Sequence, residues 1–229
     1  MLRPKKKISK KEIKQDTLVT WYAEATSFYE KQKRAIGIVT TAIIVVVIAG
    51  LVYTKNRAEN NERAMAEIGQ VRELFDQGQY QAAIDGIAER NIPGLKSIVD
   101  NYGNSKGGDL ARFLLASAYY NLGKYDEALT QFEAFSPSDE LLAASRYGGI
   151  AQCYEGKKNY SEAAGYFEKA GAKYPKDVTA AENLNNAARN YALAGNKEKS
   201  LELYKRLKKD YPTSQYARDA ERFIAELSL

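Results

Sequence analysis

The amino-acid sequence predicts an all-α protein, in which a single transmembrane helix is followed by an α-solenoid of about four helix hairpins and a C-terminal capping helix. The first observation is a run of 20 residues without a charge, residues 35–54. The second is a helix–turn–helix pattern that recurs in residues 55–229, which is the signature of a repeat architecture. The composition agrees, because a chain with 45% hydrophobic residues and only 5 Pro can build a helical core.

The uncharged run has the length of a membrane span. It reads AIGIVTTAIIVVVIAGLVYT, and at about 1.5 Å per residue such a helix crosses the roughly 30 Å hydrocarbon core of a bilayer. The β-branched stretch from Ile43 to Ile48, and Tyr53 at the edge, are typical of a membrane helix rather than of a buried core helix. Basic residues border the run on both sides: Lys31, Lys33 and Arg34 before it, Lys55 and Arg57 after it.

A cleaved signal peptide is the main alternative for this run. Signal peptides place an apolar stretch of about 7–15 residues close to the N-terminus, before a small-residue cleavage site. Here 34 residues precede the run and no convincing cleavage site follows it. No Cys follows it directly to carry a lipid, since Cys153 lies far downstream. We therefore expect a permanent anchor.

The charge distribution predicts the orientation of this anchor. Residues 1–34 hold ten Lys and Arg against four acidic residues, whereas residues 55–229 hold 24 basic and 25 acidic residues. Because an excess of Lys and Arg marks the cytoplasmic side, we expect a single-pass protein of the inner (cytoplasmic) membrane with a cytoplasmic N-terminus. The expected domains are a basic cytoplasmic tail with a juxtamembrane amphipathic helix (1–34), the transmembrane helix (35–54) and a periplasmic repeat domain (55–229).

The basic tail does not indicate nucleic-acid binding. It carries no readout motif and adjoins a membrane span, so a topogenic or lipid-surface role is the better interpretation. Apolar and aromatic residues before the span recur at helical spacing, which fits a helix on the cytoplasmic membrane face or one that contacts a membrane partner. These residues are Leu18, Trp21, Tyr22, Ala25, Phe28, Tyr29 and Gln32.

Four turns align in the second part of the chain, at residues 78–80, 123–125, 158–160 and 195–197. A small residue follows each turn at a fixed distance, which lets the second helix of a hairpin approach the first closely; these residues are Ala83, Ala128, Ala163 and Ser200. Four residues later an apolar residue, mostly aromatic, lies on the same helix face (Ile87, Phe132, Phe167 and Tyr204). One hairpin cannot bury its apolar face alone, so the units are expected to stack.

This pattern resembles the tetratricopeptide repeat over roughly residues 62–229. The third unit carries it nearly intact, with Tyr147, Ile150, Ala151, Tyr154, Tyr160, Ala163, Phe167, Ala170 and Pro175. The second unit lacks the closing Pro, the fourth has Lys197 and Ser200 where Tyr and Ala are usual, and the first keeps little beyond its turn and Ala83. The first interval is the longest, which predicts an additional short helix near residues 93–102, and residues 213–228 are expected to form the capping helix.

No catalytic constellation is apparent in the sequence. The chain has no His and one Cys, and it lacks a nucleophile elbow and a Walker loop. We therefore expect no enzyme, no cofactor, no metal and no small-molecule substrate. The glycine-rich segment from Gly103 to Gly108 is interpreted as a turn, and Cys153 as a buried, small apolar residue.

The resemblance implies that a peptide ligand lies in the groove lined by the first helix of each hairpin. By alignment, the groove candidates are Phe113, Ser117, Tyr120, Asn121, Gln152, Glu155, Asn185 and Arg189. They do not match the two-Lys, two-Asn carboxylate clamp known in the family. A polar cluster on one first helix can be a solvated face or a polypeptide contact; it comprises Asn183, Asn185, Asn186, Arg189 and Asn190.

Two functions fit these features. The first is a membrane-anchored interaction scaffold or chaperone-like subunit, with protein partners in the membrane or the periplasm. Its order of tail, span and repeats is similar to that of the ancillary subunit of the Sec translocon, which associates with the protein-conducting channel and a periplasmic folding factor. The alternative is a structural or envelope-assembly factor, acting in peptidoglycan, division or outer-membrane assembly without chaperone activity.

Overall fold

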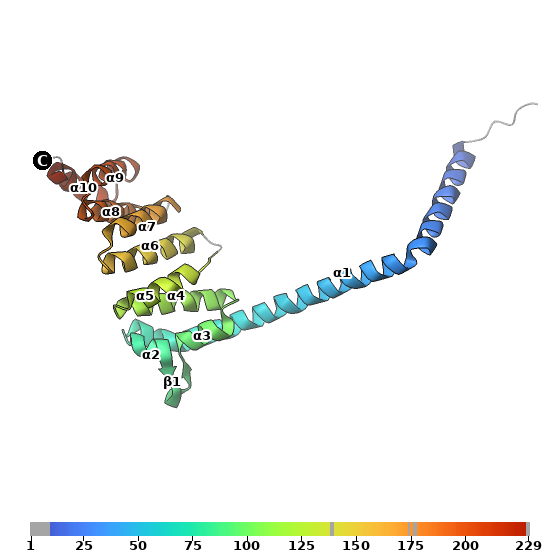
Figure 1. Ribbon diagram of the computed structural model, residues 1–229, viewed down its shortest axis with the longest axis horizontal. Helices are drawn as coiled ribbons and strands as arrows, with labels where there is room; N and C mark the ends of the chain where they lie inside the picture. The colour runs from blue at the N-terminus through green and yellow to red at the C-terminus, as the bar shows by residue number, and fades with distance from the viewer. Residues whose placement is uncertain (1–9, 138–139, 174, 176–177, 228–229) are drawn as a thin grey trace, which may run out of the picture. The chain divides into compact units, whose positions relative to one another are not determined.

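The computed structural model describes residues 10–137, 140–173, 175 and 178–227 (Figure 1). The chain divides into two compact units, residues 1–56 and 57–229. Helix α1 runs from Lys10 to Asp76, so its residues fall in both units. Among the described residues, one helix is long and apolar enough to cross a membrane, and it is this one. Its large apolar side chains between Ile38 and Tyr53 are at least half exposed.

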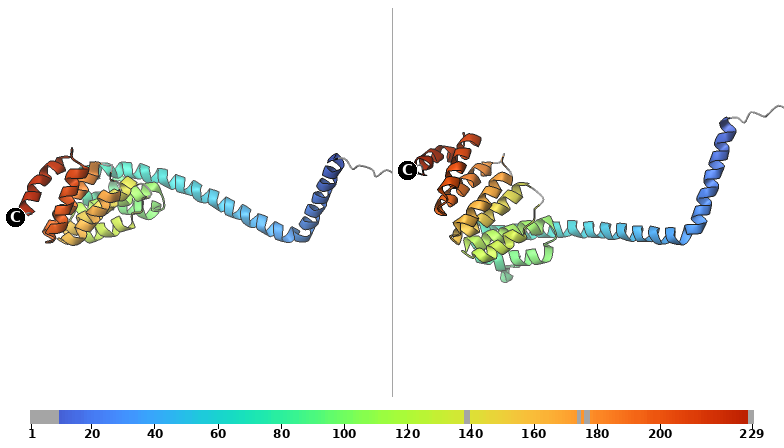
Figure 2. Two further views of the ribbon diagram at one scale, coloured as in Figure 1. Left: turned by 90° about the horizontal axis from the view of Figure 1, so that it is seen from above. Right: turned by 45° about the horizontal axis from the view of Figure 1, so that its top comes forward.

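The second unit consists of helices that pack in chain order. They are α2 (Tyr80–Asp85), α3 (Leu95–Tyr102), α4 (Lys106–Asn121), α5 (Tyr125–Ala134), α6 (Glu140–Gly156), α7 (Tyr160–Lys173), α8 (Val178–Leu193), α9 (Lys197–Asp210) and α10 (Gln215–Leu227). Each of α4 to α10 lies against the next, as the views in Figures 1 and 2 agree. The all-α architecture expected from the sequence is therefore confirmed, as an apolar N-terminal helix and then stacked helix pairs.

Each predicted turn separates the two helices of one pair. Gly78, Gly123 and Gly195 have φ angles of 73°, 72° and 84°, in the left-handed region that Gly adopts most easily. Lys158 holds the same position in the third turn with φ 62°. The second helix of the pair begins two residues later in every case, at Tyr80, Tyr125, Tyr160 and Lys197.

The interval between the first two turns contains the expected extra helix, α3, and also a short β-ladder that the sequence pattern does not predict. Strands β1 (Gly86–Ile87) and β2 (Ile92–Pro93) form a short antiparallel ladder in which Gly86 pairs with Pro93 and Ile87 with Ile92. A 3₁₀ turn, Ala88–Arg90, connects them. Because each strand has two residues, no period-two pattern could develop in the sequence.

The glycine-rich segment is only partly a turn, which corrects the expectation. Helix α4 begins at Lys106, and Ser105 caps it by accepting a hydrogen bond from the Gly108 N–H at 3.0 Å. A Cβ on Gly107 would lie 2.7 Å from the Ala64 Cβ, and one on Gly108 would overlap the Tyr102 carbonyl oxygen. These glycines therefore serve close packing of α4 against α1 and α3.

Small residues sit where the helices of a pair approach. Ala83, Ala128, Ala163 and Ser200 are all 0% exposed. The aromatic side chains that follow are buried too, and Tyr204 stacks on Phe223 of α10 with ring centroids 5.1 Å apart. The buried apolar residues form two clusters, one from α1 to α6 and one from α6 to α10. The Tyr154 and Tyr166 rings stack with their centroids 5.5 Å apart and pack against both clusters, so apolar packing is continuous along the second unit.

The second and third helix pairs contact each other where aromatic rings of α5 pack on glycines of α6. A Cβ on Gly149 of α6 would lie 2.5 Å from the Phe132 ring, and one on Gly156 would lie 2.5 Å from the Tyr125 ring. Both rings belong to α5. The contact between the second and third pairs therefore requires the absence of a side chain at two positions of α6.

This contact generates a stability prediction with a built-in control. Gly149→Ala forces the Phe132 ring to move, and we expect it to destabilise the chain by about 1–3 kcal/mol. At Gly165 of α7, an added Cβ would have no atom within 4 Å, so Gly165→Ala should stabilise by about 0.5–1 kcal/mol through helix propensity. Thermal unfolding of the full-length chain in detergent measures both. Equal shifts for the two variants would contradict the packing described.

Candidate functional site

A hollow of about 220 Å³ crosses the first helices of three successive pairs, α4, α6 and α8. We name it the first-helix hollow. Its polar lining comes from Ser117 on α4, Ser145 and Gln152 on α6, and Thr179, Glu182, Asn183 and Asn186 on α8. A Cβ on Gly148 would lie 3.6 Å from the Asn183 Oδ1, so Gly148 leaves room beside that amide. Amide groups donate and accept hydrogen bonds, which suits an extended polypeptide backbone.

Three of the eight predicted groove residues line this hollow, namely Phe113, Ser117 and Gln152. Glu155 and Arg189 lie on the same two helices, α6 and α8, and bind each other across them, with Arg189 Nη2 2.6 Å from Glu155 Oε1. This ion pair is partly exposed, so its contribution to stability is small.

The other predicted residues have local partners. The Tyr120 ring packs on Tyr125 at 5.7 Å, and Asn121 Nδ2 donates to the Ser117 carbonyl oxygen at 2.8 Å. Asn185 is half-buried and is not part of the lining, where its neighbours Asn183 and Asn186 lie instead. A helix turns by about 100° per residue, so a shift of one position in the alignment changes the face that is chosen.

Asn190 belongs to the polar cluster that could have been a solvated helix face, but its side chain is buried, at 0% exposure. Its Nδ2 donates to the Asn186 carbonyl oxygen at 2.9 Å. It stands five residues before Gly195, where the second and third pairs carry Ala118 and Cys153 at the same distance from their turns. The fourth pair is thus polar at a position that is apolar in its neighbours.

An apolar pocket of about 190 Å³ adjoins the first-helix hollow, and Phe113 lines both. Leu110, Phe135, Pro137 and Leu142 complete its walls, and Asp109 lies at its edge. Burial raises the pKa of Asp109, while Arg112 and Arg57 act in the opposite direction. An apolar side chain of a bound polypeptide could enter this pocket while its backbone contacts the amides.

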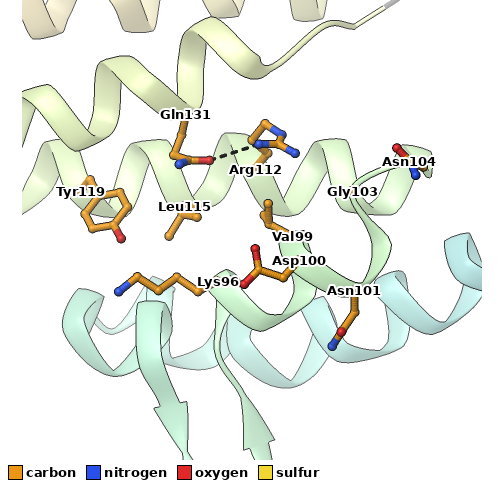
Figure 3. A pocket seen from close by; sticks show the side chains of 10 residues that line it. All are labelled: Lys96, Val99, Asp100, Asn101, Gly103, Asn104, Arg112, Leu115, Tyr119 and Gln131. Carbon is orange, nitrogen blue, oxygen red and sulfur yellow. Dashed lines mark hydrogen bonds between the residues drawn. The ribbon is translucent and has the colours of Figure 1, made fainter.

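A further hollow, of about 530 Å³, lies where α3, α4 and α5 meet (Figure 3). Sequence reasoning missed it, since α3 belongs to the interval that departs from the repeat. Arg112 Nη1 lies 3.4 Å from Gln131 Oε1, and Arg112 Nε is buried without a hydrogen-bond partner in the described part of the chain. Such a donor costs about 1–3 kcal/mol when it is left unsatisfied. The Tyr119 phenol and the Asp85 carboxylate raise the pKa of Lys96 on the opposite wall.

No group of three or more His, Cys, Asp or Glu side chains among the described residues could hold a metal ion. Cys153 is 0% exposed, and burial raises the pKa of its thiol to about 12. The thiol is therefore protonated at neutral pH and packs as a small apolar group, which agrees with the expectation.

These helix pairs are stacked in chain order around two apolar clusters that Tyr154 and Tyr166 join, and they define an α-solenoid repeat protein. Residues 113–178 match one model of the tetratricopeptide repeat, and residues 186–214 match a second. The chain thus contains tetratricopeptide repeats, and a long apolar helix precedes them. Repeats of this kind typically bind other proteins and are typically not enzymes.

Solved structures share the fold. A putative kinesin light chain of Podosopora anserina with nearly identical TPR-like repeats is 16% identical, with a TM-score of 0.58 over 73% of this chain and 86% of that chain. A variant of the same protein gives 16% identity and a TM-score of 0.57 over 73% and 85%. No curated protein matches the sequence.

The buried thiol gives a prediction about reactivity. With its pKa raised from 9.0 to about 12, Cys153 should have about a thousandfold less thiolate than an open thiol, and should resist alkylation between about pH 7 and about pH 9. Iodoacetamide labelling followed by mass spectrometry measures the rate, with unfolded chain and the exposed Ser97→Cys/Cys153→Ser variant as controls. Native labelling as fast as that of the control variant would refute the burial.

Proposed function

We propose that the protein is a membrane-anchored interaction scaffold whose repeats bind a polypeptide partner. The observation that carries the proposal is the first-helix hollow, in which amide groups from α6 and α8 lie beside an apolar pocket that shares Phe113. This arrangement suits an extended segment with one apolar side chain. The predicted groove residues Glu155 and Arg189 fit the same proposal, because their ion pair joins two of the helices that form the hollow and can open toward a charged partner.

The anchor is proposed to be residues 35–54, with residues 1–34 in the cytoplasm and residues 55–229 as the repeat domain outside it. The uncharged run in α1 and the exposure of its apolar side chains support a membrane environment. The excess of Lys and Arg before the run supports the orientation.

A chaperone-like role beside the Sec translocon is the specific form of this proposal. It rests on the similar order of tail, span and repeats in the ancillary translocon subunit. In this form the partner is a component of the protein-conducting channel or a periplasmic folding factor.

The groove is tested by site-specific photo-crosslinking in native membranes. A photoreactive residue in place of Gln152, which lines the hollow, should capture a polypeptide, and the same residue in place of the exposed Glu127 on α5 should not. Adding Asn183→Ala/Asn186→Ala should lower the yield about fivefold or more, because hydrogen bonds to the partner are lost.

The matched variant is Asn185→Ala, which changes the same residue type outside the lining and should leave the yield unchanged. Equal capture from positions 152 and 127 would reject the groove. If the captured polypeptide is neither a channel component nor a folding factor, the Sec form is rejected while the scaffold remains.

The anchor is tested by fractionation of a chain with an N-terminal epitope. We expect the epitope to remain on the protein, and the chain to stay in the membrane during alkaline carbonate extraction. Protease added from outside the cytoplasmic membrane should digest the repeats and spare the tail. The variant Ile44→Arg/Val47→Arg should be extracted, since each Arg at the centre of a span costs about 2.5–3.5 kcal/mol. Loss of the epitope would instead identify a cleaved signal.

A further inference from the structure

The hollow between α3, α4 and α5 breaks the repeat at two matched positions. Arg112 stands eleven residues before the turn residue Gly123, where the next two pairs carry Tyr147 and Leu184 before their own turns. Gln131 stands eight residues after Gly123, at the position of Tyr166 and Leu203.

In the later pairs these positions are apolar contacts. The Tyr147 and Tyr166 rings pack at 6.4 Å, and Leu184 and Leu203 are buried at 3% and 0% exposure. In the second pair the apolar contact is replaced by a polar one, with Arg112 Nη1 3.4 Å from Gln131 Oε1. Packing in the core therefore does not explain why the position of Arg112 carries a cation.

The Arg112 guanidinium has more hydrogen-bond donors than the described residues use. It is permanently charged and carries five N–H donors in a planar fork that matches a carboxylate. Its Nε is buried and has no partner, so a ligand in the hollow would meet the terminal nitrogens, of which Nη1 lies 3.4 Å from Gln131 Oε1. Among the described residues the guanidinium forms no ion pair. Gly103 makes room for it, because a Cβ there would lie 3.1 Å from Arg112 Nη2.

Two more charged groups line the same space. Figure 3 shows the Asp100 carboxylate on α3 and the Lys96 side chain around the hollow that Arg112 enters from α4. Lys96 has a partner, Asp85, at 3.5 Å, whereas Asp100 forms no ion pair within the described part of the chain. The hollow therefore offers a cation and an anion that form no ion pair with each other among the described residues, and the carboxyl group that interacts with Arg112 is that of Asp109 on its own helix.

Val99 and Leu115 lie beneath the hollow, but they are 8% and 2% exposed, so its accessible lining is mainly polar. We propose that the hollow binds the charged backbone of an amino acid or a short peptide. Arg112 takes the carboxylate of the ligand, and Asp100 takes its ammonium group. This site is separate from the first-helix hollow and does not depend on the function proposed for it.

The test reads Arg112 directly. The NMR signal of the Arg112 Nε–H group, assigned by its loss in Arg112→Met, is followed in the full-length chain in an uncharged detergent. Leucine and dileucine are titrated against isocaproate, which is leucine without its amino group, at matched ionic strength. We expect the signal to shift with leucine or dileucine, and isocaproate to bind about tenfold more weakly, since it lacks a charged partner for Asp100. A stronger effect of dileucine than of leucine identifies a peptide as the source.

Three variants complete the experiment. Asp100→Asn, at an exposed position, should bring leucine and isocaproate to similar affinity, and Arg112→Met should abolish binding of both as seen by calorimetry. Arg206→Met, on α9 outside the hollow, should change neither. If Arg112→Met does not fold, Asp100→Asn alone decides the question. Absence of a shift with leucine and dileucine, or a preference for leucine that survives Asp100→Asn, overturns the proposal.

Discussion

The close approach of helices at small residues is the constraint on which the second unit depends. Ala83, Ala128 and Ala163 are completely buried, and each sits at the same distance from a turn. Because a larger side chain would separate the two helices, these positions fix how far the aromatic residues can reach into the next pair. The Phe132 ring packs directly on Gly149 and the Tyr125 ring on Gly156, because neither glycine has a side chain that would keep the ring away. Burial of this kind, rather than helix propensity, provides most of the stability of such helices.

Packing and binding meet on α6. Cys153 is buried in the core, while Gly148 and Gln152 line the first-helix hollow. Gly149 does both, since it lies against the Phe132 ring and also lines the hollow. Adjacent residues differ by about 100° around a helix, so the exposed Gln152 can be polar while its neighbour Cys153 packs in the core.

The periodic part of the structure could be predicted from the sequence, because it follows from spacing alone. The turns at Gly78, Gly123, Lys158 and Gly195 and the burial of Cys153 are examples. The preference for Asn183 and Asn186 over Asn185 could not be predicted in this way, since it depends on the rotation of α8 by a fraction of a turn. The β1–β2 ladder and the hollow beside α3 could not be predicted for another reason, because the segment that forms them interrupts the repeat.

Departures from the repeat carry more functional information than its regular positions do. A residue that obeys the pattern, such as Leu203, is explained by the core that it fills. Arg112 and Gln131 are not, because the equivalent positions in the following pairs are apolar and well packed. Replacing such a contact by a cation with an unsatisfied donor lowers stability, and a bound carboxylate would balance the charge of the guanidinium. The same reasoning gives no site at Asn190. Its Nδ2 donates within its own helix, and its Oδ1 is buried without a partner in the described part of the chain, but the residue is 0% exposed and so cannot meet a ligand. A polar residue in place of an apolar one therefore indicates binding only where a hollow opens beside it, and in the described chain the space around Arg112 meets that condition.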